Sequence, residues 1–288
     1  MDFLTTALLQ GLGYASLGIG IFLSLRIFNI PDITTDGSYT SGGVITATLL
    51  VAGVHPVVTL IVAIAGGMIA GALTGIIHTR LKINPLLAGI LVMTALYSIN
   101  LFIMDRSNLP LMNVCTAFNC FPFSNLQYCY WLVMLSFVIV LLFIITWLLK
   151  TDFGIAMRAT GNSEAMVRSM GVNTGRMKIT GLAIANGLTA MSGYLLTQYQ
   201  GFADINMGIG IVISGLGSVM IGEAILKKLT QLGIIYHIIA VILGSILFRL
   251  ILALALSLGL NPNFLKLVTA VIVLAIVGIS NARKNSVA

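Results

Sequence analysis

The chain has 288 residues, of which 58% are hydrophobic and only 8% are charged, and its formal net charge is +7. Its mean hydropathy is +1.07, and apolar runs of about 20 residues recur along its length, which excludes a water-soluble globular protein. Basic residues stand mostly at the ends of these runs. The positive charge therefore indicates orientation in a bilayer and not affinity for nucleic acid.

Nine apolar runs follow one another, and they predict an all-α, polytopic membrane bundle of about 8–10 transmembrane segments. The runs cover residues 4–27, 41–54, 57–78, 86–103, 130–149, 179–198, 208–221, 233–258 and 264–279. Asp2 stands where a signal peptide has basic residues, so we expect the first run to stay in the mature protein. The distribution of basic residues between the runs predicts an N-terminus outside the cell and a C-terminus inside.

Two of the runs, residues 41–54 and 208–221, have fourteen residues each. At 1.5 Å per residue such a helix reaches roughly 21 Å, against a hydrocarbon core of about 30 Å, so neither run spans a bilayer alone. Each follows a polar stretch that contains an acid, IPDITTDGSYT before the first and YQGFADINM before the second. We therefore expect unwound backbone next to two half-helices, either buried in protein or lining a cavity.

The two half-helices occupy matching places in the chain. Each follows a Gly-rich helix and precedes a long helix, an Asn-Pro turn and a final helix. This order predicts one transmembrane domain with an inverted repeat: residues 1–103, a connector helix and cytoplasmic loop at 128–178, and residues 179–280. Coincidence in a Gly-rich chain is the alternative. Inverted repeats with broken helices are typical of transporters, whose pathway lies where the broken helices meet.

Asp36 is the acid with the strongest indication of a function, because a carboxylate near the membrane interior is costly and is usually paired or functional. It either belongs to a polar hinge that lines the route or caps the half-helix that begins near Ser41. Asp204 and Asn206 are the matching pair in the second half, with a plain outer loop as the alternative. The candidate pathway residues are Thr34, Thr35, Asp36, Ser38, Tyr39, Asn186, Asp204 and Asn206.

Three other features lie inside the apolar runs. Arg249 needs either a carboxylate partner or a path along which it snorkels to the outer interface, and snorkelling is favoured. His237 is interpreted as a packed residue and not as a proton relay. Gly67, Gly71 and Gly75 form a GxxxGxxxG ridge, which lets another helix approach closely, within the chain or between two chains.

The longest polar interval, from Lys150 to Lys178, holds five of the fifteen basic residues and is predicted to be a cytoplasmic loop. Within it we expect a short helix that is capped by Asn162 or Ser163 and closed by Gly171. The predicted helix carries Glu164 and Arg168 as an ion pair, with Met166, Val167 and Met170 together on its apolar side. A soluble partner can seat against such a patch.

No enzymatic chemistry is visible in the sequence. It has no G-x-x-x-x-G-K-[ST] loop for a nucleoside triphosphate, no cysteine and histidine cluster with metal-site spacing and no HExxH motif. We therefore expect no catalytic residue, metal or other cofactor in this chain. Cys115 and Cys120 lie in one outer loop, where they either pair in an oxidising compartment or remain two surface thiols.

The polar loop also carries a motif, GIAMRATGN at residues 154–162, followed by Glu164-Ala165 and Gly171-Val172. This motif resembles the cytoplasmic loop of the membrane subunits of bacterial ABC importers, in the branched-chain amino acid and ribose permease family. Residues 190–193 and 219–223 are similar to the family's AGLAG and IGG stretches, although Glu223 replaces a glycine. The ITTDGS element at residues 33–38 resembles that of a subgroup linked with the uptake of aromatic amino acids.

The resemblance implies a permease subunit that moves a small polar solute, an amino acid in particular, into the cytoplasm by alternating access. Its partners would be a second permease subunit, commonly an identical one, cytoplasmic subunits that bind ATP and Mg, and an extracytoplasmic substrate-binding protein, with lipids of the bacterial cytoplasmic membrane around them. The family's coupling helix falls on residues 162–171. The residues expected to couple the chain to the ATPase are Arg158, Asn162, Ser163, Glu164, Met166, Val167, Arg168, Met170 and Gly171.

Two other classes of protein fit parts of the pattern. An ion-coupled secondary transporter also has inverted repeats and broken helices, and it would need an intramembrane ion site, for which Asp36 is the candidate. A membrane scaffold or receptor without transport would use the loop for docking alone.

Overall fold

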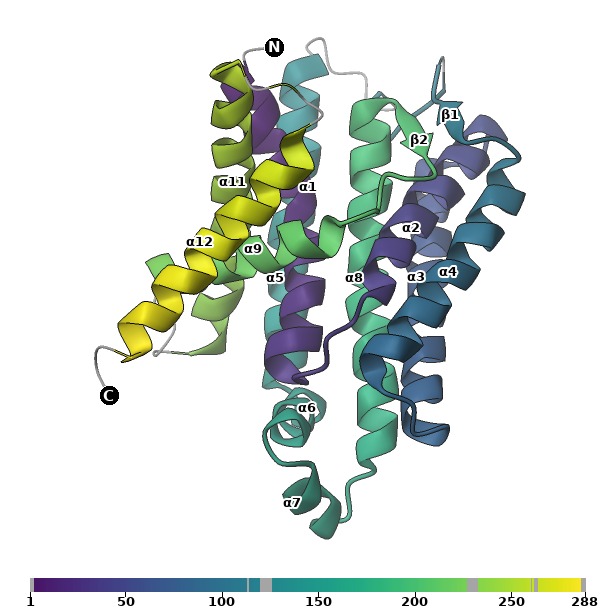
Figure 1. Ribbon diagram of the computed structural model, residues 1–288. Helices are drawn as coiled ribbons and strands as arrows, with labels where there is room; N and C mark the ends of the chain where they lie inside the picture. Colours follow the sequence, from purple (N-terminus) through teal and green to yellow (C-terminus); the bar gives the residue numbers. More distant parts are fainter. Residues whose placement is uncertain are drawn as a thin grey trace.

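A computed structural model describes residues 3–285 of the chain, apart from residues 113, 120–125, 227–232, 260 and 262–263. Within this part, six helices are long and apolar enough to span a membrane. The protein is therefore a polytopic helical membrane bundle, as the apolar runs predict (Figure 1).

The helices follow the order of the predicted runs. The first half contains α1 (Phe3–Ile21), which continues as the π-helical segment η1 (Phe22–Ile27), then α2 (Thr34–Val51), α3 (Pro56–Arg80) and α4 (Pro85–Met104). Strand β1 (Asn108–Pro110) is followed by α5 (Leu126–Lys150), α6 (Asp152–Asn162) and α7 (Glu164–Ser169). The second half contains α8 (Thr174–Gln200), strand β2 (Phe202–Asp204), α9 (Ile211–Ile225), α11 (Ile234–Ser257) and α12 (Leu265–Asn285).

Local sequence signals set where several helices begin. α3 and α4 each start with a proline, which suits the first helical position because the missing N–H would have no partner there. The residue before each proline caps the helix: His55 Nδ1 accepts from Val57 N at 3.3 Å, and Asn84 Oδ1 accepts from Leu86 N at 3.0 Å. Asn173 caps α8 in the same way. These ends were predictable to within a few residues.

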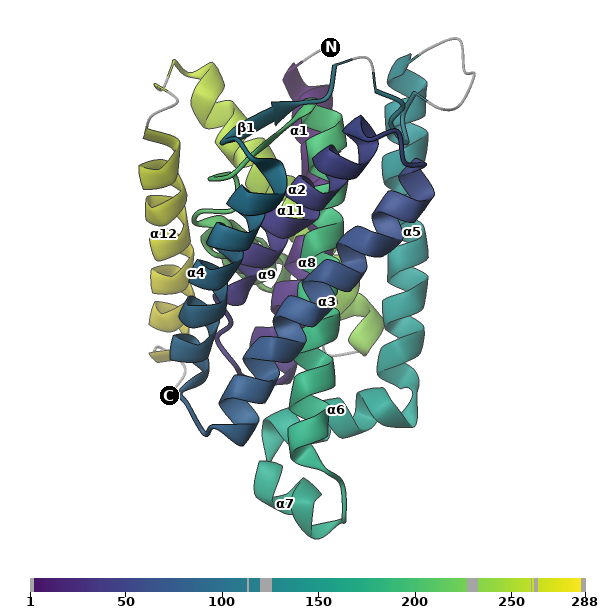
Figure 2. The same cartoon turned by 90° about the vertical axis from the view of Figure 1, so that its right-hand side faces the viewer.

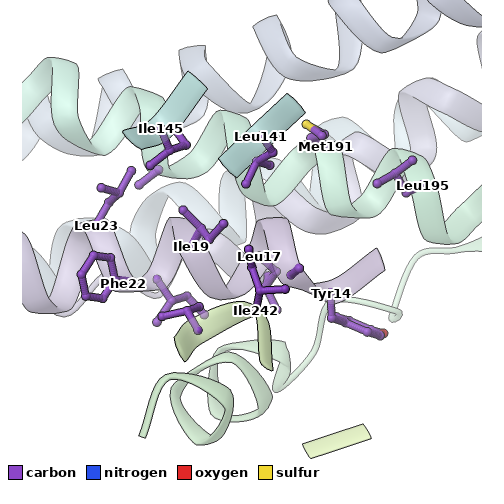
Figure 3. Close-up of a cluster of buried hydrophobic side chains, with 14 of the residues drawn as sticks. Tyr14, Leu17, Ile19, Phe22, Leu23, Leu141, Ile145, Met191, Leu195 and Ile242 are labelled. Carbon is purple, nitrogen blue, oxygen red and sulfur yellow. The ribbon is translucent and has the colours of Figure 1, made fainter. Parts of the chain in front are cut away.

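The two Gly-rich helices, α1 and α8, form the centre of the bundle. In the most apolar 18-residue stretch of each span, 83% of the residues are buried in α1 with η1 and 72% in α8. The corresponding share is 33% or less in α3, α4 and α5. Figure 3 shows Leu17 and Ile19 of α1 among side chains from α5, α8 and α11. The exposed apolar faces of α3, α4 and α5 are available to lipid.

The GxxxGxxxG ridge on α3 faces α8 within the chain. A Cβ added at Gly67 would lie 2.5 Å from the carbonyl oxygen of Asn186, and one at Gly71 would clash with the carbonyl oxygen of Leu182. A Cβ at Gly75 would lie 2.7 Å from the Cα atom of Ile179. The two backbones therefore touch along three turns, which a larger residue at any of these positions would prevent.

The first half-helix is longer than the sequence predicts. α2 begins at Thr34 and not near Ser41, so the polar stretch around Asp36 is helical, and the irregular backbone lies earlier, at residues 28–33. Hydropathy does not predict the first turns of α2 because their residues are polar. These residues are nevertheless buried, and they have hydrogen-bond partners on neighbouring helices. α9 is short as predicted, with fifteen residues.

The halves of the chain cross the bundle in opposite senses. α1, α3 and α5 run from the end that carries β1 towards the end that carries α7, whereas α8 and α11 run the other way (Figures 1 and 2). The Gly-rich helix of each half packs closely against the third helix of the other half, α8 on α3 and α1 on α11. The inverted repeat and its boundaries stay a prediction. An inverted repeat requires helices of the two halves to pack against each other in this reciprocal way.

The end of the bundle opposite α7 is closed by a two-stranded sheet. β1 pairs antiparallel with β2, with Asn108 opposite Asp204. Cys115, close by in the chain, is disulfide-bonded, and Cys129 is a buried free thiol. Cys120 lies outside the described residues. Of the two interpretations of this loop, the disulfide is therefore the one that the structure supports.

Candidate translocation pathway and coupling loop

The half-helix α9 begins inside the bundle, and its first backbone N–H groups are bound by Asp36 of α2. Gly210 is the cap residue of α9, with a φ of +82° that a glycine adopts without strain. Asp36 Oδ2 accepts from Gly210 N at 2.8 Å, and Oδ1 accepts from Val212 N at 2.9 Å. A carboxylate at the positive end of a helix is favourable. Asp36 is thus a cap, but the helix that it caps is α9, from the other half of the chain. The predicted cap on its own half-helix, near Ser41, was wrong.

A second buried acid, Asp32, joins the start of α2 to the middle of α8. Asp32 Oδ1 accepts from Thr34 N at 2.9 Å, and Oδ2 accepts from Asn186 Nδ2 at 2.6 Å. Asn186 Oδ1 in turn accepts from Ser38 Oγ at 2.6 Å. Sequence reasoning did not single out Asp32, although an Asp two residues before a Thr at a helix start is a typical capping pattern. The candidate residues Thr34, Ser38 and Asn186 are brought together in this network.

Two more of the candidate pathway residues face other partners. Thr35 Oγ1 donates to the carbonyl oxygen of Asp32 at 3.1 Å. The ring of Tyr39 stacks on that of Tyr14 in α1, with centroids 6.0 Å apart and planes 13° apart. The guanidinium carbon of Arg249, in α11, lies 3.5 Å from the centre of the Tyr14 ring on α1. Arg249 is therefore held by a cation–π contact. Whether its end also reaches the outer interface, as the sequence favours, stays a prediction.

Asp204 and Asn206 lie away from this network, next to the two-stranded sheet. Asp204 Oδ1 accepts from Asn206 N at 2.7 Å, and Asp204 Oδ2 accepts from Asn108 Nδ2 at 3.5 Å. This is a local turn stabilised by an aspartate side chain. This is a plain loop at the end of the bundle that carries β1, in agreement with the alternative interpretation of these residues as a loop.

A cavity opens between α1, α9, α11 and α12. Its volume is about 520 Å³, within the range of small-molecule sites. It reaches Gly210 and Ile211 at the start of α9, and Leu252, Ala253 and Leu256 of α11 form part of its apolar wall. Its polar lining includes Gln10, Gln200, Ser214, Arg249, Lys266 and Thr269. The cavity therefore reaches the helix terminus that Asp36 caps.

An ion pair holds the other end of α9. Arg26, at the end of η1, pairs with Glu223, at the position where the resemblance expected a glycine. His237 of α11 also faces this carboxylate, with Nδ1 3.9 Å from Glu223 Oε1, and its ring stacks on Phe22 with centroids 5.8 Å apart. α9 is thus fixed to η1 at one end and to α2 at the other, and His237 is packed as expected.

The polar loop after α5 folds into two helices that project from the bundle (Figures 1 and 2). Arg158 of α6 donates to the carbonyl oxygen of Leu149 at 3.2 Å, which fixes α6 to the end of α5. Asn162 is the last residue of α6 and not the cap of the next helix. Ser163 occupies the cap position of α7, but its side chain makes no capping bond. Gly171 follows α7 with a φ of +83°, as expected of a glycine that closes a helix.

The apolar side of α7 differs from the prediction. Met166 and Met170 are 63% and 70% exposed, whereas Val167 is 4% exposed and packs into the protein. Met166 and Met170, the cap residue after α7, are four apart and lie on one side, whereas Val167 is turned by about 100° from Met166. The exposed apolar surface of α7, called here the methionine pair, therefore consists of Met166 and Met170.

Glu164 is the centre of a charged network that ties α7 to α8. Its carboxylate accepts from Lys178 Nζ at 2.6 Å, from Arg168 Nη2 at 2.9 Å and from Thr174 Oγ1 at 3.0 Å. The hydrogen bond from Lys178 is the main reason that the pKa of Glu164 lies below its ordinary value, with Thr174 and the charge of Arg168 adding to it.

This lowered pKa predicts an acid-sensitive α7. Because the folded pKa is depressed, the network stabilises α7 fully above the ordinary pKa of Glu164, and the stabilisation is lost as the pH falls through the lowered value. We expect amide hydrogen exchange in residues 164–169 to become several-fold faster, after correction for intrinsic rates, between pH 6 and about pH 3. Glu164→Gln should show fast exchange at both pH values. Equal pH dependence in the variant and the parent protein would contradict the assignment.

α6 is in close contact with the segment that leads to α2. A Cβ added at Gly161 would clash with the carbonyl oxygen of Ile27 and lie 3.0 Å from the Cα atom of Phe28, and one at Gly181 of α8 would clash with the Phe28 ring. Residues 27–28 are thus seated between α6 and α8. The projecting loop touches the end of η1 directly, next to Arg26 and the irregular residues 28–33.

Comparisons with known proteins agree with these features. Residues 3–277 match the model of a protein family described as branched-chain amino acid transport system / permease component. The chain is 39% identical to the tyrosine transport system permease protein of Clostridioides difficile (strain R20291), over 98% of this chain and 92% of the relative. It is 24% identical to the ribose import permease protein of Bacillus subtilis, over 66% and 59% of the two chains. No solved structure matches the chain.

Proposed function

The chain belongs to the family of branched-chain amino acid transport permease components, and from this premise we propose that it is the membrane subunit of an ATP-driven importer. In this proposal it works in the bacterial cytoplasmic membrane as a dimer, most simply of two identical chains. Two cytoplasmic subunits bind ATP and Mg, and an extracytoplasmic binding protein delivers the substrate. The chain itself is a transport subunit and not an enzyme.

The observation that carries the proposal is the form of the projecting loop. α7 stands clear of the spans with the methionine pair exposed, and the network around Glu164 holds it firmly to α8. Exposed apolar side chains on a rigid helix are suited to insertion into a groove of another protein. A motor subunit that grips α7 would therefore move α6 and α8 with it, instead of bending a flexible loop.

The contacts suggest how such a movement would reach the pathway. Movement of α6 would act on Ile27 and Phe28, against which Gly161 is packed. The movement would then pass along residues 28–33, which include Asp32, to α2. Asp36 would transmit it from α2 to the start of α9. The Arg26–Glu223 ion pair would have to break or move with α9. We propose that α2 and α9 tilt together, which opens the route alternately to the two sides.

The proposed orientation places α7 in the cytoplasm and β1 outside. Lys150, Arg158, Arg168, Arg176 and Lys178 all belong to the loop end of the bundle, as the positive-inside rule requires of a cytoplasmic face. The disulfide-bonded Cys115 lies near β1, at the opposite end, and disulfides persist in oxidising compartments outside the cytoplasm. Both features favour an N-terminus outside and a C-terminus inside.

An amino acid is the proposed substrate. Support comes from the description of the matching family and from the tyrosine permease of Clostridioides difficile, which covers nearly the whole chain. L-Tyrosine is therefore the first substrate to test.

The experiment combines the energy source with the proposed coupling surface. The permease is co-expressed with a candidate ATPase and a candidate binding protein from the same organism, and L-tyrosine uptake is measured in vesicles with and without internal ATP. We expect the double variant Met166→Glu and Met170→Glu to lose co-purification of the ATPase and to lower ATP-dependent uptake about tenfold or more, because two buried unpaired charges oppose docking.

Met112→Glu is the matched control, since Met112 is 80% exposed but lies near β1, at the other end of the bundle. It should bind the ATPase and transport as the parent protein does. Uptake that persists without ATP and stops when the proton and sodium gradients are collapsed would replace this proposal with an ion-coupled secondary transporter. Unchanged ATPase binding by the methionine variant would refute the assigned coupling surface.

A further inference from the structure

Two cations line the cavity at the start of α9, and neither forms an ion pair within the part of the chain that the structure describes. We propose that Arg249 and Lys266 form a carboxylate-binding site, which receives the α-carboxylate of the transported amino acid on its way past α9. The inference rests on the proposed function and adds to it the chemical group that the permease itself recognises.

The position of the cavity is the first argument. It lies between helices from both halves of the chain, and it reaches Gly210, the cap residue of α9. Its volume of about 520 Å³ exceeds that of any single amino acid side chain and falls in the usual range of small-molecule sites. Gln10, Gln200, Ser214 and Thr269 add neutral polar groups to its wall, next to apolar residues such as Leu252. A zwitterion with an apolar or aromatic side chain matches such a mixed lining.

The environment of Arg249 is the second argument. One side of its guanidinium group faces the Tyr14 ring, 3.5 Å from the ring centre, and Tyr14 is itself stacked on Tyr39. The two tyrosines are 6% and 1% exposed, so this support is rigid. A guanidinium held by its face still presents N–H groups along its edge, where they match the two oxygens of a carboxylate. The stack therefore orients Arg249 without satisfying its hydrogen bonds.

The balance of charge is the third argument. The residues that line the cavity include no Asp or Glu, and both oxygens of Asp36, at the start of α9, are engaged by Gly210 N and Val212 N. Lys266 is close enough to Asp36 for their charges to interact, yet the two form no ion pair. Arg249 lies within the candidate span α11, where a cation without a carboxylate partner is costly and indicates a ligand pathway. Neither cation has a carboxylate partner among the described residues, and a carboxylate ligand supplies one.

The test measures binding to the permease alone, because the binding protein makes its own selection of substrates. The permease is reconstituted in nanodiscs of phosphatidylcholine, and saturation-transfer difference NMR is recorded with three probes: L-tyrosine, tyramine, which lacks the carboxylate, and 3-(4-hydroxyphenyl)propionate, which lacks the amine. We expect both carboxylates to bind and tyramine to bind about tenfold more weakly or not at all. Arg249→Gln should weaken L-tyrosine binding about tenfold, and Arg249→Lys should weaken it less.

Arg106→Gln is the control, since Arg106 is exposed near β1 and does not line the cavity. It should bind L-tyrosine as the parent protein does, and thermal unfolding of all variants checks that the bundle is intact. Equal binding of L-tyrosine and tyramine, or unchanged L-tyrosine binding by Arg249→Gln, would overturn the site. Complete displacement of L-tyrosine in nanodiscs that contain phosphatidylglycerol would also overturn the site, because the cations would then bind a lipid phosphate. ATP-dependent uptake is a separate measurement, and its absence would refute the proposed function instead.

Discussion

Asp36→Ala is expected to lower ATP-dependent uptake by about tenfold or more, because it removes the acceptor of two backbone N–H groups at the start of α9. Each of these bonds has a charged acceptor and is worth ~1.5–3 kcal/mol, and the N–H groups would be left without partners in the protein interior. α9 would no longer be tied to α2, so movement of α2 would not be transmitted. The measurement is the initial rate of L-tyrosine uptake into vesicles that contain ATP.

Asp36→Asn and Asp204→Ala separate this interpretation from general damage. Asn keeps one oxygen acceptor but not the charge, so its uptake should fall between those of Asp36→Ala and the parent protein. Asp204, at the end of β2, supports a local turn and a long bond to Asn108 of β1, away from α9, and its alanine variant should transport nearly normally. Thermal unfolding shows whether each variant is folded. If Asp36→Ala and Asp204→Ala transported equally well, the cap on α9 would have no special part in transport.

The helices of this protein were largely predictable from sequence, for a physical reason. In a bilayer every backbone polar group must be satisfied within the segment, so a run of apolar residues has little choice but a helix. Prolines and capping residues then mark the starts, as Asn84-Pro85 does for α4. The same rule explains the misplaced start of α2. Its first turns are polar, and a buried polar helix is stable there because its side chains find partners on other helices, among them Thr74, Asn100 and Asn186.

The sequence indicated several residues of the candidate site, but it did not indicate which residues they contact. Asp36 was recognisable as an unusual acid, yet its partner is 174 residues away in the chain, and no local pattern identifies such a partner. The Arg26–Glu223 pair was signalled only by a glutamate at a position where the resemblance expected glycine. Lys266 and Tyr14 gave no signal, because a lysine at a helix start and a tyrosine in a Gly-rich helix are ordinary residues. Only the fold places Lys266 in the cavity wall and Tyr14 against Arg249.

The orientation of α7 shows the same limit. A helix of six residues has fewer than two turns, and its sequence alone does not say which side faces the protein. Val167 is turned inward by the docking of α7 on the start of α8, where Glu164 binds Lys178 and Thr174. The ion pair between Glu164 and Arg168, by contrast, follows from their spacing of four and was predictable.

Gly71→Leu is expected to prevent recovery of folded protein, because Gly71 lies where the backbones of α3 and α8 touch. Even a Cβ there would clash with the carbonyl oxygen of Leu182, a backbone atom that can move only if α8 moves. Gly71→Ala should therefore destabilise the bundle by ~1–3 kcal/mol, the usual cost of overpacking, and leucine by more. Fluorescence-detected size-exclusion chromatography gives the yield of monodisperse protein, and a thermal melt gives the stability of the alanine variant.

Gly66→Ala is the matched control on the same helix. An added Cβ at Gly66 would lie 2.7 Å from Ile45 Cδ1, the far end of a flexible side chain, so the change needs only a rotamer shift. Alanine also favours a helix over glycine by ~1 kcal/mol, so this variant should be as stable as the parent protein or more stable. The two alanine variants add the same methyl group five residues apart, and only the one facing backbone should be harmful. If both lowered stability equally, the loss would reflect crowding anywhere on α3, and close backbone contact between α3 and α8 would not be what holds the two halves together.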